Sequence, residues 1–133
     1  MPRTLEVQVE QIGATTGKGT VRTHSVTIDR PVDKGGADRG PMGGELLLLS
    51  LGGCFLSNLL AAIGARSAEV SNVRVTVTGT IGGVPERFEA MEMRVVAKYS
   101  DRDLMQKLVA NAERGCIVTN TLKTALVIHI ALE

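Results

Sequence analysis

Two cysteines are the residues of this 133-residue chain with the most distinctive chemistry. Cys54 lies in the middle of a long apolar stretch, where a cysteine commonly serves as a small buried hydrophobe. Cys116 follows Gly115, which can end a helix, and lies close to Arg114 and to the expected start of a short helix. Helix N-termini and neighbouring cations lower the pKa of a thiol and favour the reactive thiolate. The residues alone leave both cysteines open as structural or reactive thiols.

Other site chemistries find little support in the sequence. The remaining soft metal ligands, His24 and His129, have no close spacing with each other or with the cysteines, so we predict no metal site. The chain has no G-x-S-x-G nucleophile motif, and GKGT at 17–20 lacks the first half of a phosphate-binding loop. The sequence therefore predicts no cofactor.

The composition is that of one ordinary domain, residues 1–133, with mixed charges. Lys and Arg total 15, Asp and Glu total 14, and aromatic residues are only 2% of the chain. These values give little support to nucleic-acid binding, which needs cations and stacking rings. The N-terminal segment carries Glu6 and Glu10 where a signal peptide would be apolar, so we expect a cytoplasmic protein. A cysteine pair there is more often catalytic or metal-binding than a permanent staple.

The uncharged run 46–65 is long enough for a membrane span. Gly52, Gly53, Ser57, Asn58 and Gly64 within it, and the lack of an aromatic belt, favour a buried central helix instead. We therefore expect no membrane partner, although a small membrane-associated protein remains an alternative.

Hydrophobic periodicity predicts an α+β chain in the order β-β-α-β-β-α-(α)-β. Alternation with period two predicts a first pair of strands, and again a second pair. The helices follow from apolar periodicity and from Ser100 as the cap of the second one, with Leu104, Leu108 and Ala112 on its inner face. The expected strands are 3–12, 20–28, 70–81, 88–99 and 125–132; the helices are 45–66, 100–115 and a short 117–122; and a long functional loop spans 30–44.

Both cysteine segments resemble those of a known family. GPMGGELLLLSLGGCFLSNLL at 40–60 is similar to the P-x-E-L-L-L-x-A-L-G-G-C helix of the OsmC/Ohr family, the osmotically inducible protein C-like and organic hydroperoxide resistance proteins. ERGCIVTNTLK at 113–123 is similar to that family's second segment, C-P-V-S-x-x-L. The resemblance covers most of the chain. It implies an intertwined homodimer with shared active sites, in which antiparallel sheets wrap around long central helices.

The resemblance also implies an activity, a thiol-dependent peroxidase acting on organic hydroperoxides or hydrogen peroxide. Cys54 would be the peroxidatic cysteine that becomes a sulfenic acid, and Cys116 the resolving cysteine that forms the disulfide. A dithiol reductant, such as a lipoyl-type dithiol, would then recycle the pair. The family also supplies an arginine, held by a glutamate, that stabilises the peroxidatic thiolate.

The chain departs from the family pattern at this glutamate. Organic-hydroperoxide members carry it ten residues before the first cysteine, where this chain has Gly44, while Glu45 stands nine before. One residue turns a helical side chain by about 100°. Glu45 is therefore either the arginine's partner or an acidic residue that suits the helix N-terminus.

The arginine has several candidates. We favour Arg39, which lies in the loop before the cysteine helix, over Arg22, Arg30 and Lys18. These departures keep a second hypothesis open, a redox-sensing or small-molecule-binding protein without peroxidase turnover.

Overall fold

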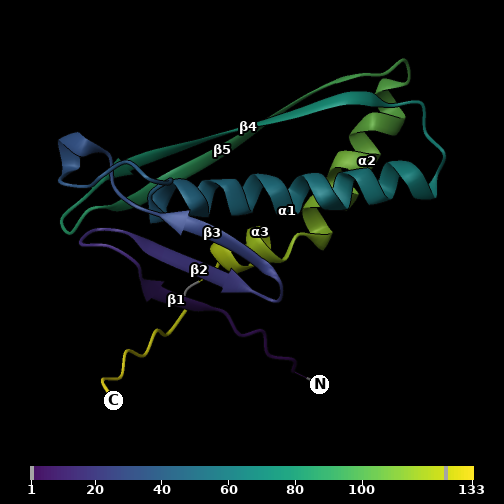
Figure 1. Ribbon diagram of the computed structural model, residues 1–133. Coiled ribbons are helices and arrows are strands. Elements are labelled where there is room, and N and C mark those ends of the chain that lie inside the picture. Colours follow the sequence, from purple (N-terminus) through teal and green to yellow (C-terminus); the bar gives the residue numbers. More distant parts are fainter. Residues whose placement is uncertain (1, 125) are drawn as a thin grey trace. The chain divides into compact units, whose positions relative to one another are not determined.

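The computed structural model describes residues 2–124 and 126–133. The chain divides into two compact units, Met1–Leu47 and Leu48–Glu133. The first unit holds β1 (Gln8–Gln11), β2 (Gly17–Val21), β3 (His24–Ile28) and the 3₁₀ turn η1 (Val32–Lys34). The second holds most of α1 (Gly43–Ala65), then β4 (Ser71–Gly82), β5 (Arg87–Lys98), α2 (Arg102–Gly115) and α3 (Ile117–Leu122). The α+β class is confirmed (Figure 1).

The first unit is a three-stranded antiparallel sheet in the order β1-β2-β3. The predicted strand 20–28 is wrong as a single element, because the chain reverses at Arg22 and Thr23. Arg22 has φ 52°, and Val21 pairs with His24 across this two-residue turn. The predicted strand 3–12 is shortened to β1, whose pairing with β2 extends only over Gln8–Gln11.

The second unit is built on the long β4–β5 hairpin. Its alternate residues, such as Val75, Val77, Met93 and Val95, are half-buried, while the intervening ones are exposed. Val75 pairs with Val95 and Val77 with Met93, so one continuous apolar face lies opposite the helices. The predicted hairpin is therefore confirmed.

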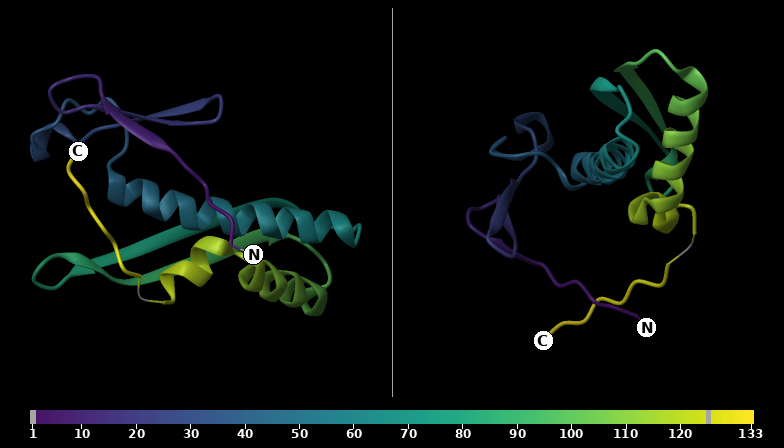
Figure 2. Two further views of the ribbon diagram at one scale, coloured as in Figure 1. Left: turned by 90° about the horizontal axis from the view of Figure 1, so that it is seen from below. Right: turned by 90° about the vertical axis from the view of Figure 1, so that its right-hand side faces the viewer.

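α1 and α2 pack on that apolar face. Figure 2 shows α1 along its axis, with α2 and the hairpin beside it. The core between them contains Leu59 and Leu108, both with no exposed surface. Burial of each leucine contributes about 1.5–3 kcal/mol. Gly52 permits close approach, because a Cβ there would lie 2.8 Å from Val77 Cγ2.

The ends of α2 agree with the sequence prediction, except for the residue that caps its start. The cap is Asp101, whose carboxylate accepts the Leu104 N–H at 3.0 Å, rather than Ser100. The positive end of the helix dipole also stabilises a carboxylate at this position. Gly115 ends α2 as expected, and the short helix α3 follows.

The predicted closing strand 125–132 is wrong for its described part. Residues 126–132 form no strand and extend away from α3 (Figure 2), while Ala125 lies outside the described residues. Within the described chain this segment pairs with no other strand, and an unpaired strand leaves its backbone groups without partners. Its apolar side chains are 66–99% exposed: Leu126, Val127, Ile128, Ile130 and Leu132.

α1 is long and apolar enough to cross a membrane, a property that it shares with core helices of soluble proteins. Its most apolar stretch of 18 residues has a mean hydropathy of 2.1, and only 22% of that stretch is buried. Much of the α1 surface is thus free to contact something beyond this chain.

Candidate functional site

The two cysteines meet in the second unit. Cys54 lies at the middle of α1 and is half-buried, whereas Cys116 lies between α2 and α3 and has no exposed surface. Both are free thiols, and Cys54 packs against the buried core cluster that contains Cys116. The second unit thus holds both predicted cysteines near one core cluster, and of the two only Cys54 is open to solvent.

Backbone hydrogen bonds fix Cys116 at the junction of two helices. Its N–H donates to the Glu113 carbonyl at 3.2 Å, which closes α2, and its carbonyl accepts the Asn120 N–H at 2.9 Å. The residue itself is extended, with φ −81° and ψ 107°, so the chain turns here. As the N-cap of α3, its Sγ accepts the Thr119 N–H at 3.4 Å. The sulfur has therefore little freedom to move.

The pair is surrounded by apolar side chains. Cys116 belongs to the buried core cluster, and Cys54 packs against that cluster. An apolar surrounding strengthens each hydrogen bond to a charge and makes an unpaired polar group costly. The other buried members are Phe55, Leu59, Met105, Leu108 and Ala112.

The pKa of Cys116 lies below its ordinary value. Burial raises this pKa, but the Thr119 hydroxyl and N–H, the Cys54 thiol and the Val118 N–H together outweigh burial. The Arg114 cation, which the sequence suggested as a neighbour, does not lower the pKa of Cys116. Its guanidinium donates to the Asn111 side chain instead. Hydrogen bonding, rather than a neighbouring cation, favours the Cys116 thiolate.

Thr119 was missed by the sequence reasoning. It is 8% exposed, and its Oγ1 makes no hydrogen bond of normal geometry with any described residue. Its position three residues after a cysteine at a helix cap is the signal that could have identified it.

Glu45 caps α1. Its Oε1 accepts the Met42 N–H at 2.8 Å, the reciprocal half of a capping box. Along one helix, nine residues place it about 14 Å from Cys54 and on the opposite face. Among the described residues no cation forms an ion pair with Glu45. In the single chain, Glu45 therefore acts as the helix-end charge that the sequence offered as its alternative role.

Arg39 lies in the first unit with an exposed side chain. Its backbone N–H donates to Asp29 Oδ2 at 3.3 Å, and its Nη1 would lie 3.3 Å from a Cβ at Gly13. Lys18, Arg22 and Arg30 are exposed in the same unit. None of the four is held by an ion pair to a described residue.

Asp29 is a second residue that sequence reasoning missed, and it organises the loop that carries Arg39. Its carboxylate is 3% exposed and accepts five hydrogen bonds. Burial raises its pKa, but the Arg30 N–H and the Thr16 and Thr15 hydroxyls outweigh this, so the pKa falls well below the usual range. The donors are the hydroxyls of Thr15 and Thr16 and the N–H groups of Arg30, Ala37 and Arg39.

Comparison with known proteins identifies the family. The model of the OsmC-like protein family matches residues 35–131, which include both cysteines. The chain belongs to the OsmC-like family. No curated protein matches the chain.

Solved structures of OsmC-like and related proteins have the same fold. A protein of Aquifex aeolicus VF5 is 20% identical with a TM-score of 0.78, over 92% of this chain and 89% of that one. An OsmC-like protein from Mycoplasma pneumoniae is 15% identical with a TM-score of 0.74, over 92% and 89%. An organic hydroperoxide resistance protein from Elizabethkingia anophelis, with thiocyanate bound, is 19% identical with a TM-score of 0.71, over 92% and 90%. At these identities the likeness shows the fold.

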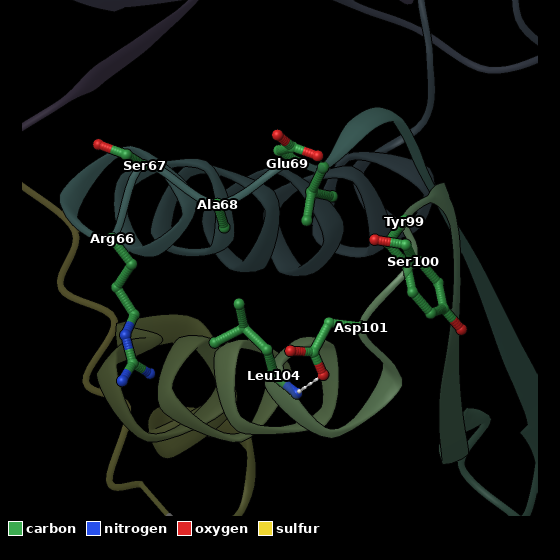
Figure 3. Close-up of a pocket in the computed structure, with 9 residues that line it drawn as sticks. Arg66, Ser67, Ala68, Glu69, Tyr99, Ser100, Asp101 and Leu104 are labelled. Carbon is green, nitrogen blue, oxygen red and sulfur yellow. Dashed lines mark hydrogen bonds between the residues drawn. The ribbon is translucent and has the colours of Figure 1, made fainter.

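A pocket elsewhere in the second unit of this OsmC-like chain lies away from the cysteines. Figure 3 shows it at the end of α1, between Arg66–Val70 and Tyr99–Asp101. Its volume is about 240 Å³. Asp101 is occupied as the cap of α2, and the Tyr99 hydroxyl accepts a hydrogen bond from Arg102 at 3.1 Å. Neither cysteine lines this pocket, so it adds nothing to the thiol site.

Proposed function

We propose that this OsmC-like protein is a thiol-dependent peroxidase that reduces organic hydroperoxides or hydrogen peroxide through Cys54 and Cys116. The observation that carries the proposal is the packing of a half-buried thiol, Cys54, against the cluster that contains a fully buried one, Cys116, whose pKa lies below its ordinary value. The organic hydroperoxide resistance protein of the same fold supports peroxide as the substrate class.

The exposure of the two sulfurs assigns their roles in this proposal. Cys54 is the peroxidatic cysteine, since a peroxide can reach it: its sulfur attacks the distal oxygen, the O–O bond breaks, and an alcohol leaves with Cys54 as a sulfenic acid. Cys116 is the resolving cysteine. Its thiolate attacks the Cys54 sulfur, the S–O bond breaks, and hydroxide leaves as the disulfide forms. A dithiol, such as a lipoyl-type dithiol, reduces the disulfide and becomes a disulfide itself.

The proposal includes the number of chains in the active protein. Leu49 and Leu60 on α1 are 63% and 51% exposed, and a Cβ at Gly53 between them would meet nothing within 4 Å. Leaving this surface in water costs about 25 cal/mol per Å². We propose that a second copy covers it, in an intertwined homodimer whose strands, including 126–132, surround both α1 helices. Such a protein would be cytoplasmic, without a membrane or nucleic-acid partner.

Arg39 and Glu45 keep their proposed roles only within that dimer. Arg39 would stabilise the Cys54 sulfur as its negative charge develops, because a guanidinium suits both a thiolate and a peroxide oxygen. Glu45 would hold that arginine with the carboxylate oxygen that does not cap α1. Each active site would then draw on both chains.

A second candidate function is redox sensing or small-molecule binding without turnover. The observation that favours it is the use of Glu45 as a helix cap, with no ion-paired arginine among the described residues. In that case the protein would not consume hydroperoxide steadily in the presence of a dithiol.

Replacement of each cysteine by serine separates these cases. We expect Cys54→Ser to consume no hydroperoxide, and Cys116→Ser to consume one equivalent per chain and then stall or over-oxidise. Steady consumption by the wild-type protein with a dithiol supports the enzyme over the sensor. Loss of even the first turnover in both variants alike would contradict the assigned roles.

A further inference from the structure

The Thr119 hydroxyl is a buried polar group with no satisfied partner. Its Oγ1 makes no normal hydrogen bond with the described residues. A threonine in a helix usually donates to a carbonyl one turn earlier, but here this bond is not made, and the Cys116 carbonyl already accepts the Asn120 N–H. Buried hydroxyls without partners are costly and call for an explanation.

The candidate acceptor for that hydroxyl is the Cys116 sulfur. The Thr119 N–H already donates to this sulfur at 3.4 Å, and the Thr119 hydroxyl is among the groups that lower the pKa of Cys116. A thiol sulfur is a weak acceptor, whereas a thiolate is a strong one. The hydroxyl therefore lacks a good acceptor while Cys116 is protonated and gains one when the proton leaves.

We propose that Thr119 is a positioning residue whose hydroxyl donates to the Cys116 thiolate and keeps Cys116 ionised for its attack on the Cys54 sulfenic acid. Thr119 acts through Cys116 and does not touch peroxide. The Cys54 thiol and the Val118 N–H also lower the pKa of Cys116.

The direction of the Cys116 pKa agrees with this arrangement. Burial raises it, and the Thr119 hydroxyl stands first among the groups that lower it. The charged neighbours in sequence are engaged elsewhere: Glu113 pairs with Lys123 at 2.6 Å, and Arg114 donates to Asn111. The helices packed on the sulfur contribute the core side chains of the cluster, which carry no charge.

The consequence for catalysis rests on the proposed function. The Cys54 sulfur attacks the distal peroxide oxygen, the O–O bond breaks, and the Cys54 proton goes to the leaving alkoxide, which becomes the alcohol. Cys116, already a thiolate, then attacks the sulfenic sulfur, the S–O bond breaks and hydroxide leaves. One thiol, one thiolate and one hydroperoxide thus give one disulfide, one alcohol and one hydroxide, so atoms and charge balance.

The test is a titration of Cys116 without peroxide. In a Cys54→Ala background, the ultraviolet absorbance of the thiolate is followed against pH with the parent residue, Thr119→Val and Thr119→Ser. We expect Thr119→Val to raise the Cys116 midpoint by about one unit and Thr119→Ser to restore it. Thr121→Val, on the same helix, is the matched control and should titrate like the parent.

A Thr119→Val curve that coincides with the parent curve would overturn the proposal, as would an equal shift in Thr121→Val. Thr119→Ala removes the hydroxyl without adding an apolar branch, and it gives the same reading if valine disturbs the fold. Because no peroxide is present, the absence of peroxidase activity would refute the proposed function and leave this titration readable.

Discussion

Cys54 on α1 packs against the buried core cluster that contains Cys116 at the α2–α3 junction, and its thiol is one of the groups that lower the pKa of Cys116. The two sulfurs differ in access, since Cys54 is half-buried and Cys116 is fully buried. Access and thiolate character are therefore divided between two residues, and this division leads to the first prediction.

The rate of alkylation of each cysteine should depend on its access to solvent rather than on its pKa. We expect iodoacetamide to label Cys54 at least about tenfold faster than Cys116 in the folded, reduced protein, because Cys116 reacts only after local opening. Mass spectrometry of peptides over time measures both rates, and unfolded protein, in which the rates converge, is the control. Faster labelling of Cys116 would show an accessible thiolate there and reverse the roles.

Asp29 should make the protein acid-sensitive. Its folded pKa is far below the unfolded value of about 3.9, so its stabilising effect is complete above that value and is lost as the pH falls toward the folded pKa. We expect Asp29→Asn to lower the melting temperature by at least about 5 °C at neutral pH and by less near pH 3. Asp33→Asn, at an exposed aspartate of the same loop, is the control.

An equal effect of Asp29→Asn at both pH values would contradict this account. It would mean that shape, rather than the charge of the carboxylate, holds the loop that carries Arg39.

The close approach of α1 to β4 should be sensitive to one methyl group. A Cβ at Gly52 would lie 2.8 Å from Val77 Cγ2, and valine side chains are stiff. We expect Gly52→Ala to lower the free energy of unfolding by about 1–2 kcal/mol in urea titrations. Gly64→Ala, where a Cβ meets nothing within 4 Å, should be neutral or stabilising by up to about 1 kcal/mol. The reverse order would refute this packing.

The exposed face of α1 should be where two copies associate. We expect the wild-type protein to sediment as a dimer and Leu60→Glu to shift it toward monomer, because a buried carboxylate without a partner is costly. Val84→Glu makes the same change at a 98% exposed residue and should leave the dimer intact. A monomeric wild type, or a dimeric Leu60→Glu, would contradict the proposed assembly.

Much of the fold could be predicted because its signals are local. The long apolar run gives α1, and strict alternation gives the β4–β5 hairpin within a residue or two of each end. The turn at Arg22 and Thr23 could not be predicted, since neither residue is a usual turn former. Residues 126–132 carry strand-like periodicity, but a strand also needs a neighbour that the single chain does not supply.

The site was predictable only in part. Cys54 and Cys116 could be selected from their sequence motifs, and the fold brings them together. Asp29 could not be selected, because its importance lies in burial and in hydrogen bonds that form only after folding. Thr119 stands three residues after a cysteine that caps a helix, which is a sequence signal, but its burial appears only after folding.

The most direct test of the central claim is a thiol count on reduced protein before and after one equivalent of cumene hydroperoxide, together with the intact mass. The account predicts the loss of both thiols and of about 2 Da per chain, as expected for a Cys54–Cys116 disulfide. Two thiols that survive unchanged would contradict it, and the binding-protein hypothesis would then take its place.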